Sequence, residues 1–371
     1  MTRQVSASEA RQLFPGIKKA EVGCHEVSKG ITLEVLESAA WKDHTHIRGS
    51  FPDREPVFEK GFETGPIYSF HCADSYVDVR SGNTIVHNQV VLEPVFRSYE
   101  FPSAEEFDHA VVLDPQRAVL PLASARMKNY CRYWTDSIAR MYVCERSSAL
   151  RDLVGAGPAQ VVAPKLKLSF QREAVYLLPA HPPMRIHKKA RLVRGPSLNA
   201  TGIVFGGQRV GRIVRDFSDH LRSIVPEAAP PDPSASGLLY VSRNESSMRR
   251  LLNEEAILPA LRDLGFEIIR PGEMPLAAQI EKFRKARVVL APHGAGLTNI
   301  LFCRPGATLI EIFPRGGVHG SMFMRIASQR DLDYYFAVGD SVATVWSESN
   351  PNNADIVLDP ERFISFVREI V

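Results

Sequence analysis

The sequence predicts an α/β protein of two domains, with a parallel sheet covered by helices on both faces in the second. Two observations carry this prediction. The chain has 371 residues, 44% of them hydrophobic and 23% charged, whereas a single domain commonly holds about 100 to 200 residues. From residue 237 onward, short runs that are apolar at every position alternate with stretches of helical periodicity, which is the pattern of a parallel, Rossmann-like sheet.

The second domain is expected over residues 238–358. Its elements alternate between strand and helix, and Gly265 ends the first helix. In chain order they are a strand at 237–242, a helix at 248–265, a strand at 266–270, a helix at 275–286, a strand at 287–291, a helix that opens near 294, a strand at 307–313, a helix at 321–331 and a strand at 334–338.

A proline-rich stretch, residues 226–237, separates the two domains. Four prolines lie there among small residues, and proline can neither continue a helix nor pair inside a sheet. The stretch therefore predicts a linker. At the far end of the chain, residues 359–371 predict an amphipathic terminal helix that is able to pack back on the N-terminal domain.

The first domain, residues 1–225, has a less regular texture. A long helix is expected at about 123–147, and apolar residues at helical spacing predict another at 209–224. Apolar runs lie before the first of these helices, at 66–70, 84–96 and 109–114, and between the two, at 160–164 and 174–179. Because strand and helix patterns do not alternate in a fixed order, the sequence predicts an irregular α/β domain.

Charge and cysteine usage exclude several classes of protein. The net charge is +3 and the charges are spread along the chain, unlike the basic blocks of nucleic-acid binders. The cysteines are odd in number and form no C-x-x-C pair, so neither a zinc ribbon nor a disulfide framework is expected. With no signal-like segment and no long apolar window, we expect a cytoplasmic protein with at most peripheral membrane contact.

The most informative segment runs from Val288 to Pro314. An apolar strand ends at Ala291, the chain turns through His293 and the glycines at 294 and 296, and a helix opens. The free amides of a first helical turn and the helix dipole both favour an anion, and glycine lets a phosphate approach the backbone. A tight turn that needs glycine only for its geometry is the alternative interpretation.

The string HGAGLTN at 293–299, between an apolar strand and the strand TLIEIFP, resembles the signature of glycosyltransferase family 61. Further matches precede it in the same order. They are Tyr240 to Arg243, Arg249-Arg250, Asn253-Glu254, Gly265-Phe266, Gln279, and Phe283 before Ala286. The resemblance implies a two-domain GT-B fold, with two Rossmann-like domains facing a central cleft and a nucleotide-sugar donor held by the C-terminal domain.

A sugar–phosphate bond that breaks leaves negative charge on a nucleoside diphosphate, which a metal or fixed positive groups must neutralise. The candidate positive groups are Arg243, which follows a strand, either Arg249 or Arg250, and the turn at Gly294. The full set of donor-binding candidates is Ser242, Arg243, Arg249, Arg250, Asn253, Glu254, His293, Gly294, Ala295, Gly296, Leu297, Asn299 and Glu311. Which of the two adjacent arginines faces the donor is left open.

No metal is expected. The one acidic triplet of the kind used by metal-dependent glycosyltransferases is Asp331-Leu332-Asp333. It precedes a strand instead of following one, at the end of a parallel sheet where ligands do not bind. We interpret it as a surface loop, so the donor would bind without a cofactor.

One N-terminal segment, 129–136, also resembles the family. Its acceptor-side candidates are Asn129, Tyr130, Arg132 and Trp134. Arg132 stands where family members usually have histidine, and Ala139-Arg140 replaces a Pro-Arg pair, which weakens the assignment. The alternative is that these aromatic residues are the core face of a helix.

An inverting transfer needs one general base near the acceptor hydroxyl. Asp136, a carboxylate within the matching N-terminal segment, is the first candidate, and a solvated helix aspartate is the alternative. His293 is the second candidate, although its place beside the turn suits a hydrogen bond to the donor.

The sequence thus predicts an inverting, metal-independent glycosyltransferase that moves a sugar from a uridine diphosphate donor to a glycan or glycolipid acceptor. The expected setting is bacterial surface or capsular polysaccharide synthesis. A binding module that keeps only the donor pocket is the competing class. A metal hydrolase built on His44, His46 and His71 is a third, and the basic stretch 185–195 is either a site for an anionic acceptor or a solvated loop.

Overall fold

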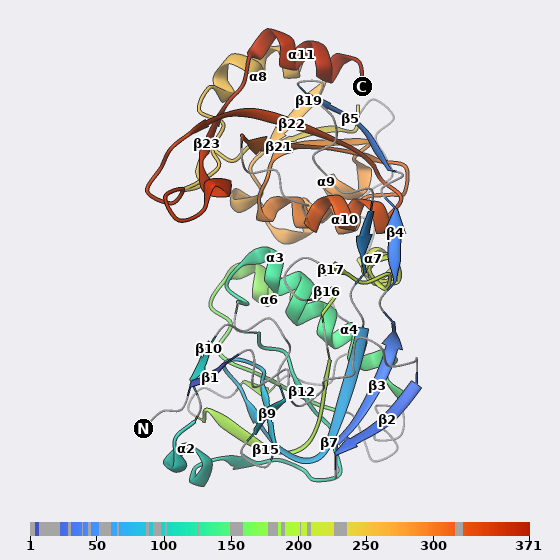
Figure 1. The fold of residues 1–371 in the computed structure, drawn as a ribbon, viewed down its shortest axis with the longest axis vertical. Helices are drawn as coiled ribbons and strands as arrows, with labels where there is room; N and C mark the ends of the chain where they lie inside the picture. Colours follow the sequence, from blue (N-terminus) through green and yellow to red (C-terminus); the bar gives the residue numbers. More distant parts are fainter. Residues whose placement is uncertain are drawn as a thin grey trace. The chain divides into compact units, whose positions relative to one another are not determined.

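The structure is a computed structural model, and its contacts divide the chain into two compact units (Figure 1). Unit 1 holds residues 1–41 and 63–213, and unit 2 holds 42–62 and 214–371. The described residues are 4–6, 23–28, 31–38, 40–43, 46–51, 61–64, 67–86, 89–91, 98–100, 102–124, 126–148, 159–176, 185–186, 190–200, 202–205, 209–225, 236–315 and 322–371.

Unit 2 contains a sheet whose main strands are parallel, as the sequence predicts. In spatial order the strands are β19 (Phe266–Ile269), β18 (Leu238–Val241), β20 (Val288–Pro292), β21 (Thr308–Pro314) and β22 (Asp333–Val342). β22 has two further partners. The strand β5 (Ile47–Phe51) pairs with it in parallel, and β23 (Asp355–Val357) pairs with its last residues in antiparallel fashion.

Helices cover both faces of this sheet (Figure 1). Those on one face are α8 (Glu254–Asp263) and α11 (Pro360–Arg368). On the other are α9 (Leu276–Lys285), α10 (Met322–Gln329) and the 3-10 helix η4 (Ala295–Phe302), which contacts α7 (Val214–Ile224). Short 3-10 turns lie at η3 (Pro271–Glu273) and η5 (Pro351–Asn353).

Two helices of unit 2 begin later than the sequence predicts. Residues 248–253 precede α8 as an irregular segment, because Arg249 has a left-handed backbone with φ of 55°, a conformation that interrupts a helix. Residues 209–210 form a strand, so α7 begins at Val214.

One core cluster of unit 2 lies between the sheet and the helices α8 and α11. Phe363, Ile364 and Val367 of α11 are buried in one cluster with Phe51 of β5. The terminal helix therefore packs within unit 2, which differs from the packing on the N-terminal domain considered above. Its apolar side chains at 363, 364 and 367 match one stripe of a helix, and α8 lies beside it.

The unit boundaries also differ from the predicted ones. A segment near the amino end, 42–62, belongs to unit 2 because β5 adds a strand to its sheet. Helix α7 belongs there as well, since Ser218 donates a hydrogen bond to the Leu301 carbonyl of η4. Of the predicted linker, only 236–237 are among the described residues.

Unit 1 is an α/β unit with a mixed sheet, in agreement with the irregular domain that the sequence predicts. The parallel part comprises β14 (Arg185–Ile186), β13 (Gln160–Ala163), β12 (Val119–Pro121), β15 (Leu192–Ala200) and β11 (Val111–Val112). The antiparallel part comprises β7 (Ile67–Asp78), β3 (Ile31–Glu37), β2 (Gly23–Ser28), β8 (Thr84–Val86) and β9 (Gln89–Val91). β7 joins the two parts by pairing with β15.

Three two-stranded pairs complete the strands. They are β1 (Gln4–Ser6) with β10 (Ser98–Glu100), β4 (Trp41–Asp43) with β6 (Gly61–Glu63), and β16 (Val204–Phe205) with β17 (Arg209–Val210). Helix α6 (Ser169–Tyr176) takes up the first residues of the apolar run at 174–179. Two α/β units, each with its own sheet, are consistent with a GT-B-like fold, and the central cleft stays a prediction.

The long helix of unit 1 runs from residue 130 to 146 in three pieces. An α-helical turn, α3 (Tyr130–Arg132), leads into the π-helix η2 (Tyr133–Ile138) and then into α4 (Ala139–Arg146). It begins seven residues later than 123, the start expected from the sequence. π-helical turns are rare and cost regular hydrogen bonds, so they need support from neighbouring groups.

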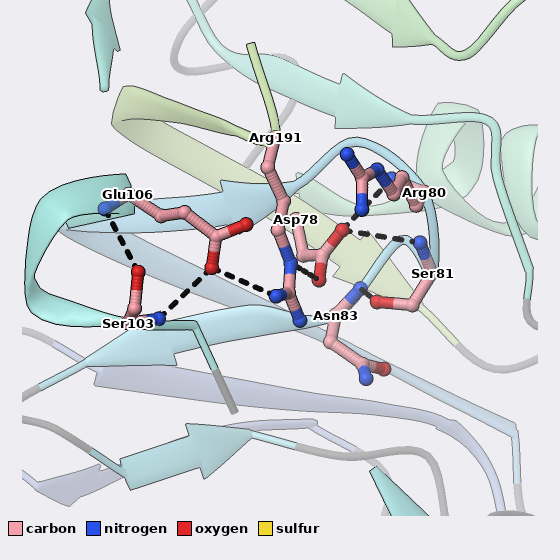
Figure 2. Close-up of polar contacts among 7 residues, drawn as sticks. All are labelled: Asp78, Arg80, Ser81, Asn83, Ser103, Glu106 and Arg191. Atoms are coloured by element: carbon pink, nitrogen blue, oxygen red, sulfur yellow. Dashed lines mark hydrogen bonds and ion pairs between the residues drawn. The ribbon is translucent and has the colours of Figure 1, made fainter. Parts of the chain in front are cut away.

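The basic stretch at 185–195 contributes ion pairs to unit 1. Arg191 donates to Asp78 at 3.2 Å and to Glu106 at 2.8 Å (Figure 2). Glu106 also completes a capping box with Ser103 at the start of helix α2 (Ala104–Asp108). The part of the stretch at 187–189 lies outside the described residues. Arg191 therefore joins β15 to α2, as a structural ion pair does.

No helix among the described residues is long and apolar enough to cross a membrane.

Candidate active site

The strand order of unit 2 creates one position suited to a ligand. β19 lies on one side of β18, and every later parallel strand from β20 to β22 lies on the other. The connections that leave β18 and β19 thus run in opposite directions across the sheet. Open α/β sheets bind ligands at such a point, beyond the carboxyl ends of the strands.

Arg243 and the glycine turn meet at this point. The register pairs Tyr240 with Leu290. Arg243 and His293 each lie three residues further along the chain, just beyond the ends of β18 and β20. The next residue, Gly294, has an extended backbone with φ of 179°, which any residue can adopt. Glycine is needed there for a different reason, because a Cβ at 294 would coincide with the Arg243 guanidinium.

The Arg243 guanidinium is held over the turn by its own loop. Its Nη2 donates to Ser246 Oγ at 2.8 Å, and its Nε lies 3.3 Å from the Met248 carbonyl oxygen. Burial, together with the neighbouring charge of Arg249, lowers the pKa of Arg243 to about 10. The guanidinium of Arg243 is therefore still charged at neutral pH. The guanidinium of Arg249 is a second cation close to it.

The structure distinguishes the two adjacent arginines. Arg250 forms a two-pronged ion pair with the buried Asp355, at 2.9 Å and 2.6 Å. Arg249 donates to Asn353 Oδ1 at 2.9 Å, and its buried Nε has no hydrogen-bond partner in the described part of the chain. Burial lowers the pKa of Arg249 while the charge of Glu311 opposes that shift. Arg249 is thus the arginine with a donor atom to spare.

His293 and Glu311 form a pair beside the turn. His293 Nδ1 lies 2.5 Å from Glu311 Oε1, and the Tyr334 hydroxyl donates to the other oxygen of Glu311 at 2.7 Å. The Glu311 side chain is 0% exposed and that of His293 is 27% exposed. Glu311 therefore lies inside the unit, in contact with His293, and His293 lies at the surface of the site.

Glu254 performs a comparable structural task at the end of β18. It is buried at the start of α8 and accepts hydrogen bonds from Tyr240, Ser242 and Asn244 at 2.7, 3.0 and 2.5 Å. Burial and the Glu254 charge raise the pKa of Tyr240 well above its usual value, so its hydroxyl stays a donor. Glu254 fixes the loop that carries Arg243, with Ser242 inside the same network.

Three other donor-binding candidates are engaged within unit 2. Asn253 exchanges hydrogen bonds with the backbone of Leu358 at 2.7 and 3.2 Å. Asn299 donates to Gln279 at 3.0 Å, and Gln279 in turn donates to the carbonyl oxygens of Pro271 and Met274. Leu297 is a core residue. Ala295 and Gly296 are partly exposed in the first turn of η4, beside the Arg243 loop.

The N-terminal candidates lie around the π-helix. Asn129 caps α3, the turn before the π-helix, by accepting from the Arg132 amide at 3.1 Å, and Trp134 is buried in the π-helix itself. Asp136 is 4% exposed, accepts from Thr135 Oγ1 at 2.9 Å and lies 3.7 Å from Arg132 Nη1. Tyr130 packs its ring against Phe170 at 5.1 Å, the core role that was the alternative interpretation for these aromatics.

The loop at Gly202 explains how the π-helix is tolerated. The Ile203 amide donates to the Thr135 carbonyl oxygen at 2.9 Å, which satisfies a group that the wider helical turn leaves free. A Cβ at Gly202 would strike that same oxygen and lie 2.8 Å from the Asp136 Cα. Glycine is therefore required for this close approach.

No group of histidine, cysteine and acidic residues in the described ranges could hold a metal ion. The acidic triplet lies at the amino end of β22, and its aspartates pair with arginines, Asp331 with Arg215 at 2.6 Å and Asp333 with Arg48 at 2.5 Å. His46 donates through Nε2 to the Met324 carbonyl oxygen at 2.9 Å. His71 belongs to unit 1, and His44 lies outside the described residues.

Sequence reasoning missed Tyr334 and Asn353. Tyr334 lies in β22 and pairs with Leu309 of β21, and Glu311 stands two residues beyond Leu309 on that strand. Because residues two apart on a strand share a face, Tyr334 and Glu311 project from the same face of the sheet. Asn353 follows an irregular loop and reaches Arg249 through a contact distant in sequence. The strand register could have indicated Tyr334, whereas no local pattern indicates Asn353.

The fold and the site define a class of protein: an α/β protein with a pair of arginines, Arg243 and Arg249, at the switch point of a parallel sheet. Residues 130–310 match the sequence profile of Glycosyltransferase 61, just under half of the chain. Over those residues the chain is similar to glycosyltransferase family 61. The matched part includes the π-helix, the Arg243 loop, the glycine turn and part of β21.

Three relatives illustrate the likeness. The chain is 35% identical over 174 residues to an alpha-1,3-arabinosyltransferase of Oryza sativa subsp. japonica, covering 44% of this chain and 28% of the relative. It is 31% identical to a beta-1,2-xylosyltransferase of the same plant, covering 32% and 26%. It is 30% identical to a xylan glycosyltransferase of Arabidopsis thaliana, covering 20% and 15%. The chain thus spans about a quarter or less of the length of the relatives it matches.

Proposed function

We propose that this protein is an inverting glycosyltransferase that transfers a sugar from a uridine diphosphate donor to a glycan or glycolipid acceptor. The observation that carries the proposal is the pairing of Arg243 with the Gly294 turn at the switch point of unit 2. Arg249 adds a second cation with an unused donor. A diphosphate fits this chemistry because it offers several charged acceptor oxygens to guanidinium groups and free amides.

The relatives suggest which sugar is moved. Three of them are named as an arabinosyltransferase, a xylosyltransferase and a xylan glycosyltransferase. We propose a pentose, xylose or arabinose, as the first sugar to test. The acceptor would then be a polysaccharide chain or a lipid-linked glycan.

We also propose that the transfer needs no metal ion. Two arginines and the amides of η4 supply the positive groups that a departing nucleoside diphosphate requires. The Asp331 to Asp333 triplet is paired with arginines at the opposite end of the sheet.

A cytoplasmic location and a role in bacterial surface polysaccharide synthesis complete the proposal. Cys72, Cys144 and Cys303 are buried free thiols. Burial raises the pKa of each to about 12. Unpaired thiols suit a reducing compartment.

The direct test is calorimetric titration of uridine diphosphate into the wild type and two variants. Arg243→Ala removes the guanidinium at the turn and is expected to weaken binding by about 1.5 to 3 kcal/mol, typical of a hydrogen bond to a charged group. Arg262→Ala removes an exposed arginine in the last turn of α8 and should leave affinity unchanged. Equal affinity for all three proteins would overturn the placement of the donor.

Release of uridine diphosphate from UDP-xylose, with and without xylan oligosaccharides, separates an enzyme from a binding module. A transferase releases the nucleotide when an acceptor is present. A module that keeps only the donor pocket binds the donor and releases nothing.

A further inference from the structure

The loop between β22 and β23 carries an exposed group of apolar side chains that the donor site does not use. Trp346 is 50% exposed and its neighbour Val345 is 76% exposed, and Val342 at the end of β22 is exposed as well. Trp134, by contrast, is buried in the π-helix. A tryptophan at the surface is typical of a binding site, because one stiff ring supplies a large contact area at a small cost in entropy.

The turn that carries Trp346 is closed by hydrogen bonds in both directions. The Thr344 amide donates to Ser347 Oγ at 2.8 Å, and the Ser347 amide donates to the Thr344 carbonyl oxygen at 2.9 Å. Asn353 Nδ2 donates to the Trp346 carbonyl oxygen at 3.1 Å. The backbone is thus held on both sides of the indole, so a ligand that binds the ring does not have to order the turn first.

This turn rises from the same edge of the sheet as the glycine turn. β21 and β22 pair in parallel as far as Pro314 and Gly339, and β22 continues beyond that pair to Val342. The carboxyl ends of parallel strands meet at one edge, which is where open α/β sheets bind their ligands. The loop that follows β22 therefore belongs to the ligand-binding edge of unit 2.

Asn353 connects the tryptophan turn to the candidate donor site. Its Oδ1 accepts from Arg249 Nη1 at 2.9 Å, while its Nδ2 holds the Trp346 carbonyl oxygen. Both contacts are made by one side-chain amide, so the cation and the turn lie close together. The adjacent ion pair between Arg250 and Asp355 joins the same two segments of the chain. Arg249 and the tryptophan turn are therefore positioned by one network of bonds.

The chemistry of the loop suits a neutral sugar. One face of a sugar ring presents C–H groups, which pack on the negative face of an aromatic ring and bury apolar area. Between Val342 and Ala354 the one charged residue in the sequence is Glu348, and its side chain is exposed. A carboxylate repels phosphate but accepts hydrogen bonds from hydroxyl groups. The arginines of the site thus favour the nucleotide, whereas this loop favours a glycan.

We propose that Trp346 and the turn at 344–347 form a binding subsite for the glycan acceptor, in which one sugar ring of the acceptor stacks on the indole. The inference rests on the function proposed above, because it needs a transferase with a glycan acceptor. The subsite binds the acceptor and takes no part in breaking or forming bonds. It lies in unit 2 and is therefore additional to the acceptor-side candidates of unit 1.

The experiment titrates xylan oligosaccharides into the full chain saturated with uridine diphosphate, and follows binding by calorimetry and by tryptophan fluorescence. Trp346→Ala removes the indole and keeps the carbonyl oxygen that Asn353 holds. We expect it to weaken oligosaccharide binding about tenfold, the order of one stacking contact, and to leave uridine diphosphate affinity unchanged. Trp346→Phe keeps an aromatic face, so it should recover most of the loss.

Three further variants make the result specific to this turn. Trp41→Ala is the matched control, because Trp41 is also exposed, at 60%, and lies in β4. It should bind the oligosaccharides as the wild type does. Arg243→Ala should show the reverse of Trp346→Ala, a loss of nucleotide affinity alone. Asn353→Ala releases both the turn and Arg249, so it should weaken the binding of both ligands.

Two results would show that no acceptor sugar contacts the indole. They are oligosaccharide binding as tight in Trp346→Ala as in the wild type, and wild-type tryptophan fluorescence that the oligosaccharides do not change. Equal losses of nucleotide and oligosaccharide affinity in Trp346→Ala would instead place the nucleobase on the ring, and equal losses of oligosaccharide affinity in Trp41→Ala and Trp346→Ala would remove the specificity of the turn. Each of these outcomes overturns the inference. Failure of the proposed function is recognised separately, because the wild type would then bind uridine diphosphate no better than Arg243→Ala does.

Discussion

Two regions of the molecule carry acidic and basic side chains that could serve a transferase, and they use them differently. At the carboxyl edge of the unit 2 sheet, Arg249 keeps a donor atom unused by the described residues, and the Arg243 guanidinium lies against the glycine turn. In the π-helix of unit 1, Asp136 is 4% exposed and is bound by Thr135 and Arg132. The first region therefore has a donor atom that a ligand could use, whereas the carboxylate of the second is bound by neighbouring side chains of its own helix.

The glycines of the two regions make the same contrast. A Cβ at Gly294 would meet the far end of a flexible side chain, whereas a Cβ at Gly202 would meet backbone. A side chain can move aside at little cost to the fold, but backbone cannot. We therefore expect a substitution at Gly294 to change ligand affinity, and a substitution at Gly202 to change the free energy of unfolding.

The largest expected effect belongs to Asp136→Asn. If Asp136 takes the acceptor proton, the amide keeps the shape and removes the basicity, so turnover falls by about a hundredfold or more while donor affinity is unchanged. Both quantities are measured on the same preparation, by product formation and by calorimetry.

Near-normal turnover of Asp136→Asn would move the role of base to another group, with His293 or another carboxylate of unit 1 the next to be tested. A parallel fall in affinity and turnover would show that Asp136 supports the fold, as its burial and its contact with Arg132 allow.

Gly294→Ala should weaken uridine diphosphate binding by about tenfold, because the new methyl group displaces the Arg243 guanidinium and its charge-assisted hydrogen bond. Gly296→Ala is the matched control. A Cβ at that position would lie 3.4 Å from Val241 Cγ1, an ordinary contact. Equal affinities for the two variants, measured by calorimetry, would show that Arg243 does not depend on the turn.

Gly202→Ala should lower the free energy of unfolding by about 1 to 3 kcal/mol, the usual range for overpacking. The added methyl group would press on the Thr135 carbonyl oxygen and on Asp136. Gly272→Ala, with nothing within 4 Å of its Cβ, is the control. Urea unfolding measures both, and a Gly202→Ala protein as stable as the control would contradict the tight contact with the π-helix.

The smallest expected effect is that of a chelator. Activity measured in excess EDTA should equal activity without it, because arginines and backbone amides serve the departing phosphate. Loss of activity that manganese restores would reveal an acidic metal site that the sequence and the described residues do not indicate.

Much of unit 2 could be predicted from the sequence because its order is local. Each strand from β18 to β21 is an apolar run followed by a helical stretch, and that alternation implies parallel pairing. It also places Arg243 and Gly294 at one edge, since both follow strand ends. The bond between His293 and Glu311 needed the register in addition, which the sequence alone does not supply.

The remaining features depend on contacts distant in the chain. No periodicity assigns β5 to the second sheet, because its partner β22 lies near the other end of the sequence. The π-helix has the apolar pattern of an ordinary helix, and its wider turn depends on the Ile203 amide. Asn353 is placed by the loop between β22 and β23 and not by a motif.

Residues 42–62 belong to unit 2 although unit 1 residues flank them in the sequence, and this affects how the protein folds during synthesis. The chain passes between the units three times, after residues 41, 62 and 213. During synthesis β5 leaves the ribosome early. It has no partner strand until β22 is made, which happens after all of unit 1 has been synthesised. Until then Phe51 lacks its core partners in α11. Completion of the second sheet is therefore a late, non-local step of folding, and its incomplete form is the stage at which exposed apolar surface invites aggregation.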